Sequence, residues 1–158
     1  MKILILQSRM GIGDMVIYLP YIEAIAKKFN TKVSLLVKES SKAEEILKNN
    51  KHIENIIFLK RSNKNQRHDG IVGSINLIKD LKKLKFNKIF IFNSSLRYNL
   101  VAKLSGIQEI HQYPLFQKKN QHIIKAAQNF IKETLGVEIE SNPIVEVNEN
   151  EIKETKNK

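Results

Sequence analysis

The stretch ILILQSRMGIGDMVIYLP, residues 3–20, decides the fold of this chain. It begins as an unbroken aliphatic run, changes to a polar loop with two glycines, and resumes as an apolar segment with one acid, Asp14, at its start. An aliphatic run without polar alternation predicts a strand buried on both faces of a parallel sheet. A strand, a glycine-containing loop and a helix in this order are typical of the ligand-facing start of a doubly wound α/β domain.

Length and composition indicate one globular domain. The chain has 158 residues, of which 42% are hydrophobic and 27% charged, which is enough for a sizeable core. Because there is no Cys, disulfides, thiolate metal ligands and thiol catalysis are excluded. The longest apolar runs are far shorter than the roughly 20 residues of a membrane-spanning helix, and the N-terminus is interpreted as a first strand, not a signal peptide. We therefore expect a cytoplasmic protein.

The order of segments predicts the sheet. Predicted strands lie at residues 2–6, 32–37, 53–59, 88–92, 107–113 and 144–147, and predicted helices at 15–29, 40–50, 73–86, 96–106 and 120–136. This alternation predicts a Rossmann-like, doubly wound parallel sheet with the order 3-2-1-4-5. The domain is expected to span residues 1–147, and residues 148–158 to form a polar linker or frayed tail.

Two helices need a more specific interpretation. Pro20 is costly deep inside a helix, so we expect it in the first turn of the main helix, after a separate leading turn of residues 14–19. In the segment 73–86, helical spacing predicts that Ile75, Ile78, Leu81 and Leu84 face the core.

The ligand site is predicted from topology alone. In such sheets ligands bind where the strand order reverses, here between the first and fourth strands, so the loops at 7–14 and 93–97 should meet. The candidate residues are Ser8, Arg9, Gly11, Gly13, Asp14, Ser94, Ser95 and Arg97. The glycines allow close approach of a ligand to the backbone, the helix start can bind an anion, and each arginine can bind a carboxylate or phosphate.

Two roles are open for Asp14, and two for the serines. An ionised carboxylate beside a ligand pocket can act as a general base, but an acid at a helix start can equally be an N-cap. The serines can contact a ligand or cap a turn.

The formal net charge of +11 predicts anionic partners or simply a soluble, Lys-rich surface. Within the loop 60–70, the cations are Lys60, Arg61, Lys64 and Arg67. No aromatic residue separates them, so phosphates or lipid headgroups fit this loop better than nucleic-acid bases; a merely solvated loop is the other interpretation. The four His residues have no metal-ligand spacing, so no metal site is predicted.

A dinucleotide fingerprint is only partly present. Gly11 and Gly13 occupy its first two glycine positions, but Val16 stands in place of the third. Glu39, after the second predicted strand, could take the place of the ribose-binding acid. A nucleotide- or dinucleotide-binding module without transferase activity is therefore the alternative function.

Three segments resemble glycosyltransferase family 9, the lipopolysaccharide heptosyltransferases. They are MKILILQSRMGIGDMVIYLPYIEAIAKKFNTKVSLLVKES, NKIFIFNSSLRYNLVAKLSGIQEIHQY and NQHIIKAAQNFIKETLGV. The Gly-Asp and Leu-Pro pairs of the first segment, the Leu-Arg and Leu-Ser-Gly of the second, and the Leu-Gly of the third match features of that family. The similarity extends over about residues 1–147.

The resemblance implies the N-terminal, acceptor-binding half of a GT-B enzyme with two Rossmann-like domains. It implies transfer with inversion, without a metal, from a nucleotide-sugar to the lipopolysaccharide core, with Asp14 as general base. The donor, ADP-heptose in this family, is expected on a second domain that these residues do not include, so the chain alone should have little activity.

The resemblance also gives the charge a use. It implies an anionic glycolipid acceptor, whose phosphates would meet Lys60, Arg61, Lys64 and Arg67, and peripheral contact with the inner face of the cytoplasmic membrane. A second-domain polypeptide is an expected partner, and a pseudoenzyme that only binds lipid or a partner is a third hypothesis.

Overall fold

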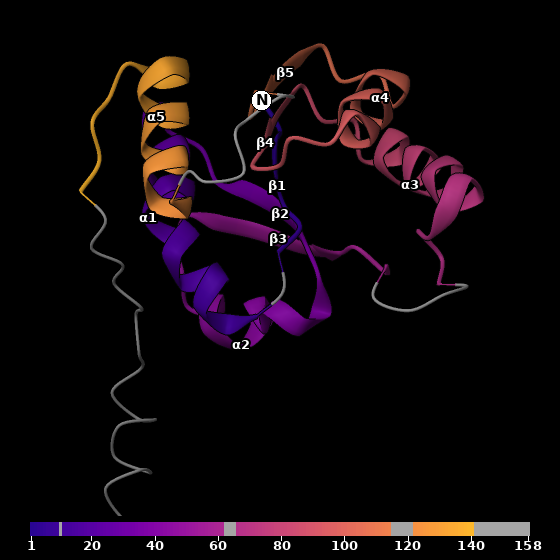
Figure 1. The fold of residues 1–158 in the computed structure, drawn as a ribbon, viewed down its shortest axis with the longest axis horizontal. Helices are drawn as coiled ribbons and strands as arrows, with labels where there is room; N and C mark the ends of the chain where they lie inside the picture. Colours follow the sequence, from indigo (N-terminus) through magenta and orange to yellow (C-terminus); the bar gives the residue numbers. More distant parts are fainter. Residues whose placement is uncertain (10, 62–65, 115–121, 141–158) are drawn as a thin grey trace, which may run out of the picture.

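The structure, a computed structural model, describes residues 1–9, 11–61, 66–114 and 122–140. Within these residues it has a five-stranded, all-parallel sheet in the order β3-β2-β1-β4-β5, which confirms the predicted topology (Figure 1). The strands are β1 (Ile3–Gln7), β2 (Val33–Val37), β3 (Ile53–Phe58), β4 (Lys88–Ile91) and β5 (Glu109–Gln112). The helices are α1 (Ile12–Lys28), the short 3-10 turn η1 (Glu39–Ser41), α2 (Ala43–Leu47), α3 (Gly70–Leu84), α4 (Leu96–Leu104) and α5 (Ile123–Leu135). The strand predicted at 144–147 and the tail lie outside the described residues.

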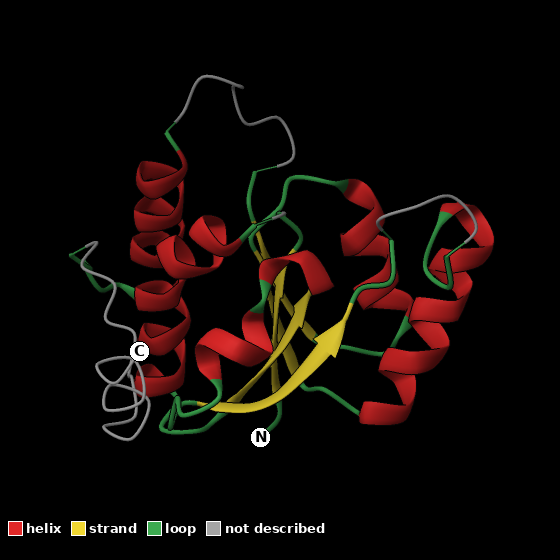
Figure 2. Ribbon diagram, turned by 90° about the horizontal axis from the view of Figure 1, so that it is seen from below, coloured by secondary structure: helices red, strands yellow, loops and turns green. Residues whose placement is uncertain are grey.

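Helices cover both faces of the sheet (Figure 2). The alternation of side chains along β1 explains why: Ile3 and Ile5 belong to a core with α1, α2 and α5. Leu4 and Leu6 belong to a second core with α3 and α4. Every residue of β1 is buried, as expected for the central strand of a parallel sheet.

The start of α1 differs from the prediction. The helix is continuous from Ile12 to Lys28, with Pro20 inside it, so the expected leading turn is not separate. Pro20 cannot donate a helical hydrogen bond. Its neighbours Leu19, Tyr21 and Ile22 are fully buried, and their burial stabilises the continuous helix by roughly 1.5–3 kcal/mol per side chain, which exceeds the proline cost.

The buried face of α3 was also predicted incorrectly at two positions. Ile75 and Leu84 are exposed, by 47% and 38%. The buried face of α3 consists of Gly73, Leu77 and Leu81, spaced four residues apart. The absence of a side chain at Gly73 lets the start of the helix lie close to the preceding loop. Ile75 lies on the opposite face and is left in solvent, whereas Leu84 is exposed as the last residue of the helix.

Candidate functional site

The loops after β1 and β4 meet, as the strand order predicted. Asn93 Nδ2 donates a hydrogen bond of 2.8 Å to Ser8 Oγ across the switch point. The Ser95 backbone N–H donates to Asn93 Oδ1 at 2.7 Å and closes a tight turn before α4. These bonds define the crevice, by which we mean the carboxyl-end surface between the loop 8–11 and the loop 93–95.

A residue of β5 holds the second loop in place. Gln112 Nε2 donates to the backbone oxygens of Asn93 and Ser95, each at 2.9 Å. Asn99 Nδ2 on α4 donates to Gln112 Oε1 at 2.8 Å. Sequence analysis missed Asn93, Asn99 and Gln112. The Asn directly after the fourth strand was a readable turn signal, whereas nothing local indicated the role of Gln112.

The crevice end of α1 is open to a ligand. Gly11 precedes the helix with φ of 114°, a conformation that favours glycine. A Cβ at Gly13 would meet nothing within 4 Å, so no described atom crowds this position of the first turn. Because the first turn of a helix has backbone N–H groups without helical partners, this surface can donate hydrogen bonds to a bound molecule.

Asp14 lies in this first turn and is half-buried. It is not the N-cap: that position is Gly11, and no side-chain cap bond is present. Among the described residues, the Asp14 carboxylate has neither a hydrogen bond nor an ion pair. Its lone pairs are therefore available to a ligand that enters the crevice.

Two buried tyrosines lie close together near the crevice, and one of them, Tyr18, interacts with the Asp14 charge. The Tyr18 and Tyr113 hydroxyl oxygens are 3.5 Å apart, and the two side chains are 0% and 6% exposed. Burial raises the pKa of Tyr18; Tyr113 and the Arg9 cation oppose this rise, while the Asp14 carboxylate adds to it. Burial raises the pKa of Tyr113 as well. Both hydroxyls therefore stay protonated, and the Tyr113 hydroxyl donates a hydrogen bond to the Tyr18 oxygen.

The last residue of β1 is a buried amide. Gln7 is 0% exposed, and neither its Nε2 nor its Oε1 has a hydrogen-bond partner among the described residues. A buried amide without hydrogen-bond partners lowers the free energy of unfolding by on the order of 1–3 kcal/mol. Polar groups of this kind commonly bind a water or a ligand. Its side chain points to the same face of the sheet as Ile3 and Ile5, towards α1.

Of the other predicted residues, the serines lie in the two crevice loops and Arg97 does not face the crevice. Ser8 accepts the bond from Asn93. Ser95 occupies the N-cap position of α4, again without a side-chain cap bond, and Ser94 is half-buried nearby. Arg97 points elsewhere: its Nη2 donates to the backbone oxygen of His68 at 2.5 Å. This bond ties the start of α4 to the loop before α3, so Arg97 is not directed at the crevice.

The basic loop is only partly available to phosphates. Lys60 is exposed, and Arg61 lies 3.8 Å from Asp69 in a weak ion pair. Arg67, however, donates two hydrogen bonds to Asp80, of 2.8 and 2.6 Å. Two N–H groups of its guanidinium are therefore already occupied within the protein. Lys64 lies outside the described residues.

Asp80 makes acid stability a testable property. The hydrogen bonds from Arg67 lower the pKa of Asp80 to about 2, although partial burial opposes this, and His68 contributes further. A carboxyl group whose pKa falls on folding stabilises the folded state at pH values above its pKa in the unfolded state. This contribution is lost as pH falls from about 4 to about 2. We expect Asp80→Asn to lower the free energy of unfolding by about 1 kcal/mol near neutral pH.

The test is urea unfolding of both proteins across this pH range. The difference between them should disappear near pH 2. Two stability curves that stay parallel down to that pH would contradict the prediction.

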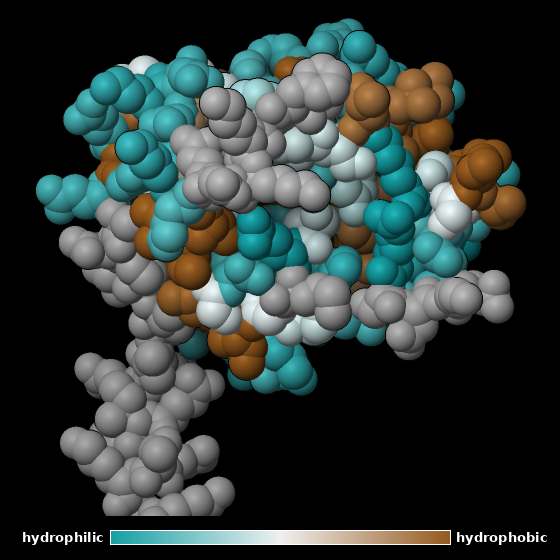
Figure 3. All heavy atoms as spheres, viewed as in Figure 1, coloured by the Kyte–Doolittle hydropathy of each residue, from teal (hydrophilic) through white to brown (hydrophobic). Residues whose placement is uncertain are grey.

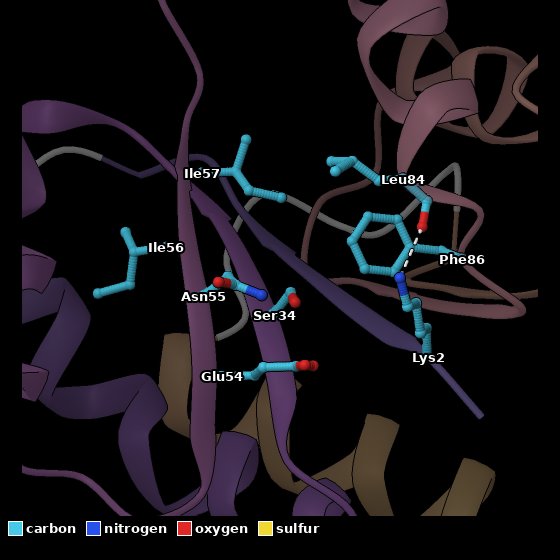
Figure 4. Close-up of a pocket in the computed structure, with 8 residues that line it drawn as sticks. All are labelled: Lys2, Ser34, Glu54, Asn55, Ile56, Ile57, Leu84 and Phe86. Atoms are coloured by element: carbon cyan, nitrogen blue, oxygen red, sulfur yellow. Dashed lines mark hydrogen bonds between the residues drawn. The ribbon is translucent and has the colours of Figure 1, made fainter.

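A separate cavity of about 270 Å³ lies towards the amino ends of the strands (Figure 4). It is lined by Lys2, Ser34, Glu54, Asn55, Ile56, Ile57, Leu84 and Phe86. Lys2 Nζ donates to the Leu84 backbone oxygen at 3.4 Å across it. Because parallel strands bind ligands at their carboxyl ends, this cavity is not part of the crevice.

Metal-binding clusters and membrane-spanning helices are both absent from the described residues. These residues contain no group of three or more metal-ligating side chains. None of the described helices combines the length and the apolar character needed to cross a bilayer.

The fold is similar to solved glycosyltransferase structures. A glycosyl transferase family 9 protein from Veillonella parvula DSM 2008 matches with a TM-score of 0.71 and 15% identity, over 99% of this chain and 48% of that protein. The E. coli ADP-heptose lps heptosyltransferase II matches with a TM-score of 0.65 and 16% identity, over 99% and 50%. The structure of E. coli heptosyltransferase WaaC with ADP matches with a TM-score of 0.58 and 16% identity, over 90% of this chain and 50% of that protein. No family model and no curated protein matches the sequence.

These matches define the class of the domain. It is a Rossmann-like α/β domain, and its fold is that of about half of a family 9 glycosyltransferase. The resemblance indicated by the sequence is thus confirmed at the level of the fold. The chain spans about half the length of the solved structures it matches.

Proposed function

We propose that this chain is the acceptor-binding half of an inverting glycosyltransferase and that Asp14 is its general base. The observation that carries the proposal is the position of Asp14. It lies half-buried in the first turn of α1, the helix that follows the Ser8 loop, without a hydrogen bond from a described residue. A base must be free to accept a proton from a bound hydroxyl, and this carboxylate is free in that sense.

The proposed step transfers a sugar to an acceptor hydroxyl. Asp14 accepts the hydroxyl proton while the acceptor oxygen forms a bond to the anomeric carbon of the donor. The bond from that carbon to the diphosphate breaks on the opposite side, and the nucleoside diphosphate leaves with the electron pair. Attack opposite to the leaving group inverts the configuration.

Other residues of the crevice would position the acceptor. Arg9, which is exposed and interacts with the Tyr18 hydroxyl, would bind an anionic group of the acceptor. The Ser8–Asn93–Gln112 network would keep the two crevice loops at a fixed separation. Fixed geometry matters because misplacement of reacting groups by about 1 Å can cost 10²-fold in rate.

The substrates are the finer part of the proposal. Two of the similar structures are an ADP-heptose lps heptosyltransferase and a heptosyltransferase with ADP. We infer a heptose donor activated by a nucleotide, held by a second domain, and the lipopolysaccharide core as acceptor. In this scheme the protein acts in the cytoplasm, at the inner face of the membrane that carries its glycolipid, where exposed Lys60 and Arg61 would meet the glycolipid phosphates.

The test is reconstitution of transfer. The chain, alone and fused to the donor-binding half of a heptosyltransferase, is incubated with ADP-heptose and a lipopolysaccharide-core acceptor, and the product is measured by mass spectrometry. We expect transfer by the fusion and little or none by the chain alone. Absence of acceptor binding by either protein would contradict the proposal.

Calorimetry with NAD and free nucleotides tests the alternative of a nucleotide-binding module. Asp14 is negatively charged and lies in the turn that would receive the pyrophosphate in such a module. Because like charges repel, this position disfavours that alternative. Tight binding of NAD by the chain alone would favour it and would count against the transferase.

A further inference from the structure

Among the described residues, the exposed large apolar side chains lie on α3 and α4, apart from Met1 and Ile12. On α3 they are Ile71, Val72 and Ile75, exposed by 83%, 69% and 47%. On α4 they are Leu96, Leu100 and Leu104, exposed by 64%, 57% and 55%. Figure 3 shows the corresponding brown areas at the upper right, over α4 and the outer end of α3. The two helices pack side by side. Ser105 Oγ, just after α4, donates a hydrogen bond of 3.5 Å to the Ile78 backbone oxygen of α3.

Cations occupy the same exposed helix faces. At 100° per residue, Lys79 and Lys82 fall on the side of α3 that carries Ile71 and Ile75. On α4, Lys103 falls beside the Leu96–Leu100–Leu104 stripe. The one acid of the two helices, Asp80, is bound to Arg67 and His68. The exposed faces of both helices therefore combine aliphatic and basic side chains without a free acid.

The formal charge of the chain is concentrated in the segment that contains these helices, although Lys88 within it is buried and paired with Glu109. Residues 60–104, from the basic loop to the end of α4, contain eleven Lys and Arg but two Asp or Glu. They hold +9 of the formal net charge of +11. The remaining segments, which include α1, α2 and α5 on the opposite face of the sheet, are almost neutral as a group.

We propose that the α3–α4 face, defined by Ile71, Val72, Leu96, Leu100, Lys82 and Lys83, docks on the surface of a bilayer that contains anionic lipid. Aliphatic side chains flanked by lysines on exposed helix faces are the features that bind membrane interfaces. The lysines would contact headgroup phosphates, and the aliphatic side chains would enter the boundary of the acyl chains. A second copy of the chain is a poor occupant, because two such faces would bring strong positive charges together.

The orientation of this face relates it to the crevice. Both α3 and α4 begin at the carboxyl edge of the sheet, and the Arg97–His68 bond joins their starts. Ile71, Val72 and Leu96 therefore lie at the crevice end of the molecule. Lys82 and Lys83, in the last turn of α3, lie towards the opposite edge of the sheet, so docking on the whole face would place the crevice beside the lipid contact. The docking itself does not depend on glycosyl transfer.

Vesicle co-sedimentation tests the proposal. The full chain is mixed with phosphatidylcholine vesicles with and without phosphatidylglycerol, both lacking glycolipid, so that failure of the proposed transferase function would leave the result intact. We expect binding only to the anionic vesicles, weakened by added salt. Lys82→Glu/Lys83→Glu should weaken binding at least about tenfold, and Ile71→Ser/Val72→Ser should also weaken it measurably.

Matched variants keep the test specific. Lys28→Glu/Lys32→Glu changes the net charge equally at exposed positions outside the α3–α4 face, at the end of α1 and just before β2, and should retain binding, as should Ile71→Leu/Val72→Leu. Circular dichroism and urea unfolding confirm that each variant is folded. Equal losses in the two lysine pairs, or no binding by the wild-type chain, would overturn the proposal. A dimer that Ile71→Ser/Val72→Ser abolishes, without vesicle binding by the wild type, would overturn it in favour of self-association.

Discussion

Replacement of Asp14 by Asn should lower the rate of glycosyl transfer by about 10²–10⁴-fold in the chain fused to a donor-binding half, with acceptor affinity unchanged. Asn has nearly the shape of Asp but cannot take the proton of the attacking hydroxyl. The expected loss is therefore in kcat, with a dissociation constant for the acceptor close to that of the wild type. Transfer is measured by mass spectrometry and acceptor binding by calorimetry.

A matched variant separates this effect from a general loss of negative charge. Glu39→Gln removes an exposed carboxylate from η1, after β2, and should leave transfer unchanged. It also addresses the dinucleotide alternative, since Glu39 is the acid that could have bound a ribose. If Asp14→Asn retains more than about a tenth of the wild-type rate, another group is the base.

Gly73→Ala should destabilise the fold by at least about 2 kcal/mol. A Cβ at Gly73 would lie 2.1 Å from the His68 carbonyl carbon and 2.7 Å from its Cα and oxygen. These are backbone atoms, and they are held by the bond from the His68 N–H to the Lys60 oxygen and by the Arg97 bond. Neither the helix nor the loop can move without loss of these interactions.

Gly13→Ala is the control for this variant, because a Cβ at Gly13 meets nothing within 4 Å. Since Gly is less favourable than Ala within a helix, this change should raise stability by a few tenths up to about 1 kcal/mol. Both are measured by urea unfolding. Equal midpoints for Gly73→Ala and the wild type would show that the loop before α3 is free to shift.

The sheet could be predicted from sequence because its signals are local. The aliphatic runs of β1, β2 and β4 have no other stable placement than a sheet buried on both faces, and alternation with helices permits few topologies. The meeting of the loops after β1 and β4 follows from that order, and the Asn93–Ser8 bond confirms it. The place of Asp14 at the start of α1 was predicted on the same grounds.

The partners of individual side chains could not be predicted in this way. Gln112 holds the loop at Asn93 from a different strand, and Tyr113 reaches Tyr18 across 95 residues. Arg67 and Arg97, both predicted to bind a ligand, instead bind Asp80 and the His68 carbonyl. A sequence shows which groups can form charged hydrogen bonds, but the choice of partner depends on distances set by packing.

The sequence by itself determined the α/β class, the strand order, the switch point and the concentration of positive charge in residues 60–104, because these depend on periodicity, connection rules and composition. Tertiary structure decided that α1 continues through Pro20, that Gly73 and not Ile75 faces the core, and that the α3–α4 face is left apolar and basic. The physical reason is that each of these outcomes depends on the burial of surfaces contributed by distant segments, whose sum exceeds the local preference of any one residue.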